Sequence, residues 1–384
     1  MIEIKNKSQC CGCCACKQIC PVAAIEMQKD EEGFWYPKVN KQICVSCGKC
    51  ERTCPELNSE DVSKESKVFA AYRKELNVRL KSQSGGIFSL IAEQIISEGG
   101  IVFGAAFDHY WNVKHTGIDK LENIELLRGS KYVQSNIEET YKEAEQYLKQ
   151  GRKVLFSGTP CQIQGLKSYL RKDYKELFTI DLICHGVPSP EVWNQYLKEY
   201  LDGKQLQEYC QKDKRNNNAI MYILKDGTKI VESYDENIYI KGFNKDLFLR
   251  PSCYECIFKG IERCSDMTLG DFWGIEKYLP DFGDRYGISA VIIHNTKGKF
   301  IYKKIKDELR SQACPKEWVE AENPCLLKSV SQSAKRKKFF ENWKKSGVTN
   351  TIKSLTKLTI KDKVKNKCLY IIELAYAVKK HILR

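Results

Sequence analysis

One cysteine pattern occurs twice near the start of this chain of 384 residues. In each copy, gaps of two residues separate three cysteines, and a fourth cysteine followed by proline comes after three more residues. The first copy contains Cys10, Cys13, Cys16 and Cys20, and the second contains Cys44, Cys47, Cys50 and Cys54. The two-residue gaps let one loop wrap three iron atoms, so residues 1–58 are expected to fold around iron–sulfur clusters.

The repeated run is the pattern of bacterial two-cluster ferredoxins, in which the fourth cysteine of each run binds the cluster of the other run. We therefore predict one [4Fe–4S] cluster on Cys10, Cys13, Cys16 and Cys54, and a second on Cys44, Cys47, Cys50 and Cys20. Cys11 and Cys14 start a second phase of the same spacing, but its next position is Lys17, so both are expected to be spectators. Zinc is the alternative metal, although structural zinc sites usually use paired C-x2-C halves.

The composition places the protein in a reducing compartment. The chain has nineteen cysteines, and no apolar leader follows Met1, so the cysteines are interpreted as metal ligands rather than disulfides. We expect a cytoplasmic protein, because no apolar run reaches the length of a membrane span. The length allows two or three domains.

The positive charge is concentrated in a basic tail. The net charge is +14, but residues 331–384 hold 15 Lys and Arg against 3 Asp and Glu, an excess of 12. A distributed nucleic-acid-binding face is therefore not expected. Val364, Cys368 and Tyr376 fall near one helical face of the tail. The tail is interpreted as a helix that packs on the domain, with docking to a membrane surface or a partner protein as the alternative.

Residues 68–330 have the pattern of a mixed α/β fold. Apolar runs predict strands, and helical spacing of apolar residues follows Gly86. The predicted strands are 68–72, 101–107, 154–156, 177–184 and 289–294. Residues 59–67 are polar and are interpreted as a linker, and residues 205–250 as an irregular region with short strands. The fold class is thus a multidomain α+β and α/β protein, with a ferredoxin-like module, a mixed α/β domain and the helical tail.

A second group of cysteines lies at predicted strand ends and in loops. It consists of Cys161, Cys184 and the pair Cys253 and Cys256, with Cys264 close behind. Spacing alone does not decide between ligands and buried apolar residues for such isolated cysteines. The other cysteines, Cys210, Cys314, Cys325 and Cys368, have no ligand spacing and are expected to be structural.

Six short motifs occur in order, at residues 84–86, 129–134, 158–162, 181–186, 250–256 and 265–274. Together they resemble the beta-subunit family of coenzyme F420 hydrogenases and dehydrogenases, over residues 68–150 for the N-terminal region of that family and 151–330 for its C-terminal region. The resemblance implies FAD and a third [4Fe–4S] cluster. It assigns Cys161, Cys184, Cys253 and Cys256 as the ligands of that cluster, with Cys264 in reserve.

The same resemblance suggests residues that bind flavin. Ser84, Gly85 and Gly86 open a helix and offer backbone N–H groups to a pyrophosphate, although an ordinary helix cap has the same sequence. Lys131 and Tyr132 are candidates to contact the flavin ring or a substrate anion. Gly158, Thr159 and Gln162 flank Cys161 and are candidates to hydrogen-bond the flavin or the cluster. Asp271 and Trp273, within the last motif, are candidates to shape the same pocket, with a place in the core as the alternative. His185 is a candidate proton relay. The G-x-G-x-x-G fingerprint of a conventional NAD site is missing after the first strand.

Two functions follow from these assignments. The first is an FAD-dependent iron–sulfur oxidoreductase that moves electrons between its clusters and a small two-electron substrate, because flavin couples two-electron to one-electron steps. The substrate is coenzyme F420 or another reducible metabolite, including one of surface-polysaccharide metabolism. The second is a non-catalytic subunit that feeds electrons to a separate enzyme. Both require a redox partner, such as a ferredoxin. A scaffold with vestigial clusters disagrees with the correctly phased cysteines.

Overall fold

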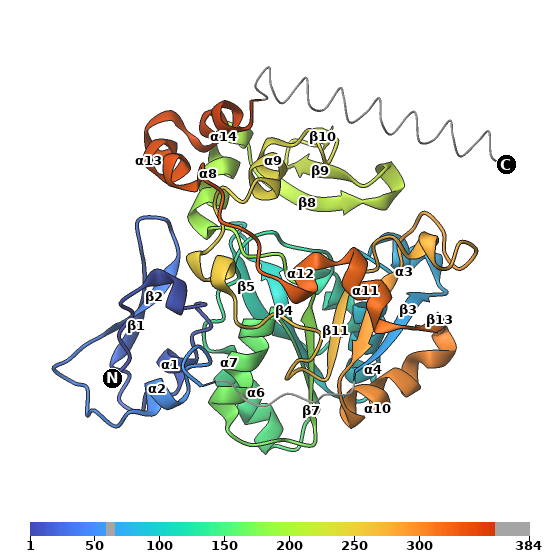
Figure 1. Cartoon of the computed structure of the whole chain (residues 1–384), viewed down its shortest axis with the longest axis horizontal. Helices are drawn as coiled ribbons and strands as arrows, with labels where there is room; N and C mark the ends of the chain where they lie inside the picture. Colours follow the sequence, from blue (N-terminus) through green and yellow to red (C-terminus); the bar gives the residue numbers. More distant parts are fainter. Residues whose placement is uncertain (59–65, 358–384) are drawn as a thin grey trace.

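The computed structural model describes residues 1–58 and 66–357, which form an N-terminal module, a central domain and a cap (Figure 1). The N-terminal module is residues 1–58. It contains an antiparallel hairpin of β1 (Ile25–Lys29) and β2 (Trp35–Val39) and two single-turn helices, α1 (Ala15–Gln18) and α2 (Lys49–Arg52). Each helix carries the third cysteine of one run. Left-handed residues, Cys14 before α1 and Gly48 before α2, turn the chain into each helix.

The central domain is built on one eight-stranded mixed sheet. Its spatial order is β13-β3-β12-β11-β7-β6-β4-β5. The strands are β3 (Lys67–Arg73), β4 (Ile101–Phe107), β5 (Val113–Ile118), β6 (Val154–Ser157), β7 (Leu177–Leu182), β11 (Met267–Asp271), β12 (Ser289–Ile293) and β13 (Leu309–Cys314). Strands β4, β6, β7 and β11 run parallel, and the outer neighbours pair antiparallel.

Helices cover both faces of this sheet. On one face, α4 (Ile87–Ser97), α5 (Ile124–Leu127) and α10 (Thr296–Ile305) form a core with the sheet. On the other face lie α6 (Thr140–Lys149), α7 (Pro160–Leu170), α11 (Lys316–Glu322) and α12 (Pro324–Leu327). The short helix α3 (Leu76–Leu80) follows β3. Parallel strands buried on both faces require continuous apolar sequences, which is why the runs at 101–107 and 154–156 are readable as strands.

The cap is a separate layer with an aromatic core. It combines α8 (Pro190–Leu201), α9 (Ile238–Asn244), α13 (Arg336–Ser346) and α14 (Val348–Thr356) with an antiparallel sheet of β8 (Leu206–Asp213), β9 (Ala219–Leu224) and β10 (Lys229–Glu232). Trp193, Tyr196, Tyr222 and Phe339 are buried in its core. The beginning of the basic tail therefore belongs to the cap, where α13 and α14 contact each other and α14 contacts α8 and α9.

The N-terminal module packs against α6 and α7 (Figure 1). The Gln18 amide oxygen accepts from the backbone N–H groups of Tyr141 and Lys142, at 3.1 and 3.2 Å. Lys17 and Glu139 form an ion pair at 2.7 Å. These contacts fix the orientation of the module on the central domain, and Cys11, Cys13 and Cys14 of the first run pack in one core with α6 and α7.

The expected sheet covered by helices is confirmed, and each predicted strand has an observed counterpart. The strand expected at 177–184 ends two residues earlier, at Leu182. Residues 205–250 are more ordered than expected, because they form the sheet of the cap. The boundary between 68–150 and 151–330 falls between α6 and β6, inside one sheet. Most of the expected linker and residues 358–384, including the helical face around Cys368, lie outside the described residues. Within the described residues, no helix is long and apolar enough to cross a membrane.

Candidate functional site

Two small cavities in the N-terminal module collect the cysteines of the repeated runs. The first cluster cavity is lined by Cys10, Cys13, Cys16 and Cys54, together with Cys11 and Cys14. The second cluster cavity is lined by Cys20, Cys44, Cys47 and Cys50. Each cavity thus receives three cysteines from one run and the fourth from the other, which is the arrangement that the predicted cross-pairing requires. The described part of the chain contains no disulfide, as a metal-binding role for these cysteines requires.

The sulfur atoms surround these cavities rather than one point. In residues 1–58 and 66–357, no three His, Cys, Asp or Glu side chains converge as ligands of a single ion. In a [4Fe–4S] cluster, each of the four thiolates binds a different iron atom, so the sulfur atoms are spread around the cluster. The donor set of both cavities therefore fits cluster chemistry, and the identity of the ligands stays a prediction.

A buried arginine lies against the first cluster cavity. Arg250 has 0% exposure. Its guanidinium donates to the backbone oxygens of Cys10 and Trp35, at 2.7 and 2.9 Å, and to the amide oxygen of Gln134 at 3.0 Å. It also reaches the Cys10 Sγ at 3.5 Å. These partners include no carboxylate, so the buried cation calls for an anionic group beside Cys10, and a thiolate-bound cluster is such a group.

The third group of cysteines converges from three segments of the central domain. Cys161 lies in the first turn of α7, which Thr159 and Gln162 cap reciprocally, and the Thr159 hydroxyl is 3.1 Å from the Cys161 Sγ. Cys184 follows β7, and Cys253 and Cys256 lie in and after a 3-10 turn at Pro251–Glu255. The thiols of Cys184 and Cys253 interact electrostatically with each other and with those of Cys161 and Cys256, so the four cysteines that the family resemblance assigns to a third cluster lie near one another.

Burial and neighbouring thiols raise the pKa values of these four thiols, and for Cys161 the largest contribution comes from Cys11. Burial is the main cause for Cys184, whose pKa is raised to about 12, and Cys161 and Cys256 add to it. The pKa of Cys253 is raised in the same way, by burial and then by Cys184. Thiolates this close together are unfavourable unless a cation holds them, and metal binding releases the protons. The four residues thus fit a cluster as a donor set.

Cys11 lies between the module and the third group of cysteines. Its thiol lies near those of Cys13 and Cys161, and the interaction with Cys11 raises the pKa of Cys161. The spacing of the sequence excludes Cys11 as a ligand of the first cluster, and it gives no indication of this position. The contact shows that the first cluster cavity and the third group are immediate neighbours.

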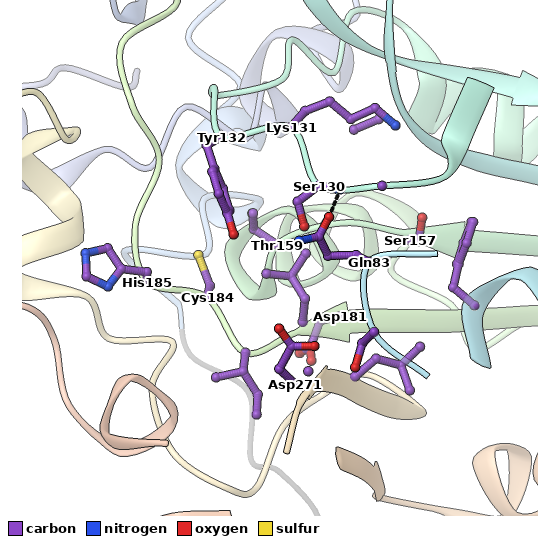
Figure 2. Close-up of a pocket in the computed structure, with 18 of the residues that line it drawn as sticks. Gln83, Ser130, Lys131, Tyr132, Ser157, Thr159, Asp181, Cys184, His185 and Asp271 are labelled. Carbon is purple, nitrogen blue, oxygen red and sulfur yellow. Dashed lines mark hydrogen bonds between the residues drawn. The ribbon is translucent and has the colours of Figure 1, made fainter. Parts of the chain in front are cut away.

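One large cavity of about 710 Å³ opens at the carboxyl ends of the parallel strands (Figure 2). Ala105 of β4, Ser157 of β6, Leu182 of β7 and Asp271 of β11 all line it. This edge is where open α/β sheets usually bind ligands, and the volume is in the range of small-molecule sites. Cys184 also lines the cavity, which places the third group of cysteines in its wall. The exposed Trp273 lies at its rim, as a face on which a flat ring can stack.

The beginning of α4 contributes backbone amides to this cavity. Ser84, Gly86 and the first turn of α4 line the cavity, and Gly86, with a φ of 84°, caps the helix without a side-chain hydrogen bond. The N–H groups of a first turn have no partner within the helix, so they suit an anionic group. Gly85 differs from the expectation. Its N–H donates to the Ser289 hydroxyl at 2.9 Å, so it serves to pack the loop against β12.

Lys131 and Tyr132 have different orientations. The ring of Tyr132 points into the cavity, whereas the side chain of Lys131 runs away from Cys184 and Asp271 (Figure 2). The Lys131 ammonium donates to the backbone oxygens of Leu126 and Arg128, at 3.0 and 2.8 Å. Burial lowers the pKa of Lys131 to about 7. Tyr132 stacks on Phe243 at 4.8 Å between ring centroids.

A hydrogen-bonded chain forms the wall behind Thr159. Gln162 accepts from the Thr159 N–H at 2.9 Å and donates to the Ser135 hydroxyl at 2.9 Å. Ser135 in turn contacts the Nδ1 of His115 at 3.0 Å, and the His115 Nε2 lies 2.9 Å from the Ser157 oxygen. Gln162 therefore has a structural task, together with Gly158 and Thr159, in shaping the cavity wall. No sequence pattern points to His115, whose pKa burial lowers to about 4.

His185 is held between two partners that the sequence does not connect. Its Nε2 lies 2.6 Å from the Asp246 carboxylate, and its Nδ1 lies 3.4 Å from the Cys325 Sγ. Burial alone would lower the pKa of His185, but the hydrogen bonds to Asp246 and Cys325 raise it to about 9. The hydrogen bond from His185 lowers the pKa of Cys325. Cys325 lines the cavity, and the spacing of cysteines in the sequence does not predict this position.

Comparison with known proteins agrees with the motifs. Residues 151–317 match the family model for the C terminus of the beta subunit of coenzyme F420 hydrogenase/dehydrogenase. The chain is similar to the coenzyme F420-dependent sulfite reductase of Methanocaldococcus jannaschii, with 26% identity over 240 residues, which are 59% of this chain and 35% of that protein. It is also similar to the F subunit of the F420H2 dehydrogenase of Methanosarcina mazei, with 23% identity over 197 residues, 47% of this chain and 55% of that protein.

A solved structure shows a more distant likeness. It is a chain of the F420-reducing [NiFe] hydrogenase complex from Methanosarcina barkeri, with 20% identity and a TM-score of 0.45. The likeness covers 69% of this chain and 86% of that one. The matched part of this chain spans less than two thirds of the length of either curated relative.

Proposed function

Because this chain belongs, through residues 151–317, to the coenzyme F420 hydrogenase/dehydrogenase beta-subunit family, we propose that it is an iron–sulfur flavoprotein oxidoreductase. Its relatives are named as an F420-dependent sulfite reductase and a subunit of an F420H2 dehydrogenase, which supports a role in electron transfer. In the proposal, electrons pass between a protein partner at the N-terminal module and a small two-electron substrate, coenzyme F420 or another reducible metabolite, in the large cavity.

The observation that carries this proposal is a continuous series of thiols from the module to the cavity. Cys50 of the second cluster cavity and Cys16 of the first pack in one cluster of buried residues. Cys11 connects the first cluster cavity to Cys161, and Cys184 of the third group reaches the large cavity. Three neighbouring cluster sites that end at a ligand cavity suit one-electron transfer to a two-electron centre.

FAD would occupy the large cavity in this proposal. It supplies the exchange between one-electron and two-electron steps. The amides of the first turn of α4, next to Ser84 and Gly86, would bind its pyrophosphate. Tyr132 and Trp273 offer aromatic faces to its ring, and the chain from Gln162 to His115 holds the wall against Ser157. The wall next to Cys184 brings the third group of cysteines close to the bound ring.

Cofactor analysis of anaerobically purified protein tests the proposal. We expect about twelve iron atoms and as many sulfides per chain, from three clusters, and one FAD. Replacing Cys161 with alanine should reduce the iron content to about eight atoms. Replacing Cys210, which lies on β8 in the cap, serves as a control and should leave iron unchanged. About eight iron atoms without flavin in the unaltered protein would contradict the proposal.

The surface around the second cluster cavity favours a second candidate, a non-catalytic subunit that passes electrons to a separate enzyme. Met1, Val22 and Val45 line this cavity with exposures of 42%, 38% and 61%, and Ile43 nearby is 48% exposed. An apolar rim of this kind is typical of a protein contact. The two candidates differ in one measurement. An oxidoreductase oxidises reduced F420, or another two-electron donor, with a viologen dye and no partner, whereas a subunit does not.

A further inference from the structure

Cys325, His185 and Asp246 form a linear arrangement in the wall of the large cavity. Cys325 lies in α12, His185 follows β7, and Asp246 follows α9, so three distant segments meet here. The Sγ of Cys325 is 3.4 Å from the His185 Nδ1, and the opposite ring nitrogen, Nε2, is 2.6 Å from the Asp246 carboxylate. A thiol, an imidazole and a carboxylate in this order are the parts of an activated nucleophile, and the third group orients the second.

The surrounding residues hold this arrangement in place. Asp246 has a φ of 53°, a left-handed conformation that aspartate tolerates better than most residues. The Tyr254 hydroxyl donates to its backbone oxygen at 2.8 Å. The imidazole meets the edge of the Phe243 ring at 5.0 Å, and the Lys259 ammonium donates to the Cys325 backbone oxygen at 2.8 Å. The geometry is therefore fixed before any ligand arrives.

The same wall offers a donor for a ligand oxygen. Asn323 lies two residues before Cys325, lines the cavity and is 3% exposed. Its amide nitrogen has no hydrogen-bond acceptor among the described residues. A buried N–H donor without a partner is costly, and a carbonyl oxygen of a ligand would satisfy it. A nucleophilic sulfur and an unpaired donor on one wall suit a carbon electrophile that carries a carbonyl group.

We propose that Cys325 is a nucleophilic thiol, with His185 as its hydrogen-bond partner and Asp246 as a positioning residue, for α,β-unsaturated carbonyl compounds. The sulfur forms a bond to the β carbon, and the carbon–carbon double bond becomes a single bond. The proton lost from the thiol ends on the α carbon, while Asn323 donates to the carbonyl oxygen. The addition is neither an oxidation nor a reduction, so it needs no further reactant and does not rest on the proposed function.

The test uses the anaerobically purified full chain and N-ethylmaleimide, which is itself an unsaturated carbonyl compound. The chain is treated with limiting reagent, and each labelled cysteine is identified by peptide mass spectrometry over time. Cys314 of β13 is the matched control, because it is also partly buried and its thiol donates to a backbone oxygen, that of Gln312. We expect Cys325 to be labelled about tenfold faster than Cys314 or more. Equal rates would overturn the proposal.

Two variants separate the roles of the neighbours. Asp246→Asn keeps a residue that accepts the left-handed backbone, and it should slow the labelling of Cys325 about tenfold without changing the labelling of Cys314. Asn323→Leu should slow the reaction with the maleimide but not with methyl methanethiosulfonate, which has no carbonyl group. A Cys325 rate that neither variant changes would contradict the arrangement. Iron content and circular dichroism of each variant report its folding. The ratio of the Cys325 and Cys314 labelling rates in the unaltered chain is a test that needs no variant.

Discussion

Replacing Arg250 with methionine removes a buried side chain that joins Cys10 and Trp35 of the N-terminal module to Gln134 of the central domain. Methionine has a similar length and no charge. The change leaves the backbone oxygens of Cys10 and Trp35 and the amide oxygen of Gln134 without the donors that now lie 2.7 to 3.0 Å away. Each buried acceptor left unpaired costs about 1–3 kcal/mol. Losing the buried cation offsets part of this cost, so we expect a net loss of about 3–5 kcal/mol in the free energy of unfolding.

The same change should lower the reduction potential of the first cluster. Arg250 reaches the Cys10 Sγ at 3.5 Å, and a nearby cation stabilises the reduced, more negative state. For charges about 6 Å apart and an effective dielectric constant of about 20, Coulomb's law gives about 3 kcal/mol. For one electron, this corresponds to a shift of about 100 mV to more negative potential.

Urea titration of the anaerobic protein measures the loss in the free energy of unfolding, with the visible absorbance of the clusters and circular dichroism as probes. Redox titration followed by electron paramagnetic resonance measures the shift in the reduction potential of the first cluster. Arg285→Met is the control, because Arg285 is exposed and donates to the hydroxyl of Tyr286 at the surface. The reasoning would be refuted if the free energy of unfolding of Arg250→Met lay within about 1 kcal/mol of that of the unaltered chain and its reduction potentials were unchanged.

Three further outcomes follow from the structure. A Cβ at Gly165 of α7 would lie 2.8 Å from the Cβ of Cys13, so Gly165→Val should lower the iron content by about one cluster, measured by an iron assay. His115 binds protons less well when folded than unfolded, so its contribution should lower stability by about 2 kcal/mol from pH 7 to pH 5, and urea titrations of His115→Gln should show a loss smaller by about this amount. Cys47 is exposed whereas Cys10, Cys13 and Cys16 are buried, so a chelator should extract iron from the second cluster first. A single-phase loss of iron would contradict this order.

The sequence predicted the central sheet well because its strands are buried on both faces. The runs at 101–107 and 154–156 are continuously apolar, and such runs have few alternatives to a parallel strand. For the opposite reason, the sequence of the cap sheet predicts only an irregular region with short strands. Strands β8 and β10 carry many polar residues, and the apolar side chains of this sheet pack in one core with α13 and α14, more than a hundred residues later. No local pattern contains that information.

The cysteines also differ in whether local sequence predicts their surroundings. The two runs place their ligands by local spacing, so their grouping around two cavities follows from the sequence. The position of Cys325 depends on His185 and Asp246, which lie 140 and 79 residues before it in the chain, and its spacing from other cysteines is uninformative. Arg250 was visible only as part of a motif. Its burial and its contact with Cys10 exist only after the module has packed against the central domain.

Two unfavourable electrostatic features lie where the N-terminal module packs against the central domain: a buried cation and a group of buried thiols. Arg250 is a buried cation whose hydrogen-bond partners among the described residues are neutral oxygens and the Cys10 thiol, and its guanidinium also lies over the rings of Phe34 and Tyr36. The neighbouring thiol of Cys16 has a raised pKa because burial, and then the nearby thiols of Cys10 and Cys14, disfavour its thiolate form. A cluster held by Cys10, Cys13, Cys16 and Cys54 would remove both costs, since its iron would bind the thiolates and its net negative charge would lie near the guanidinium. Binding of the first cluster and packing of the N-terminal module are therefore thermodynamically linked, because each lowers the free-energy cost of the other.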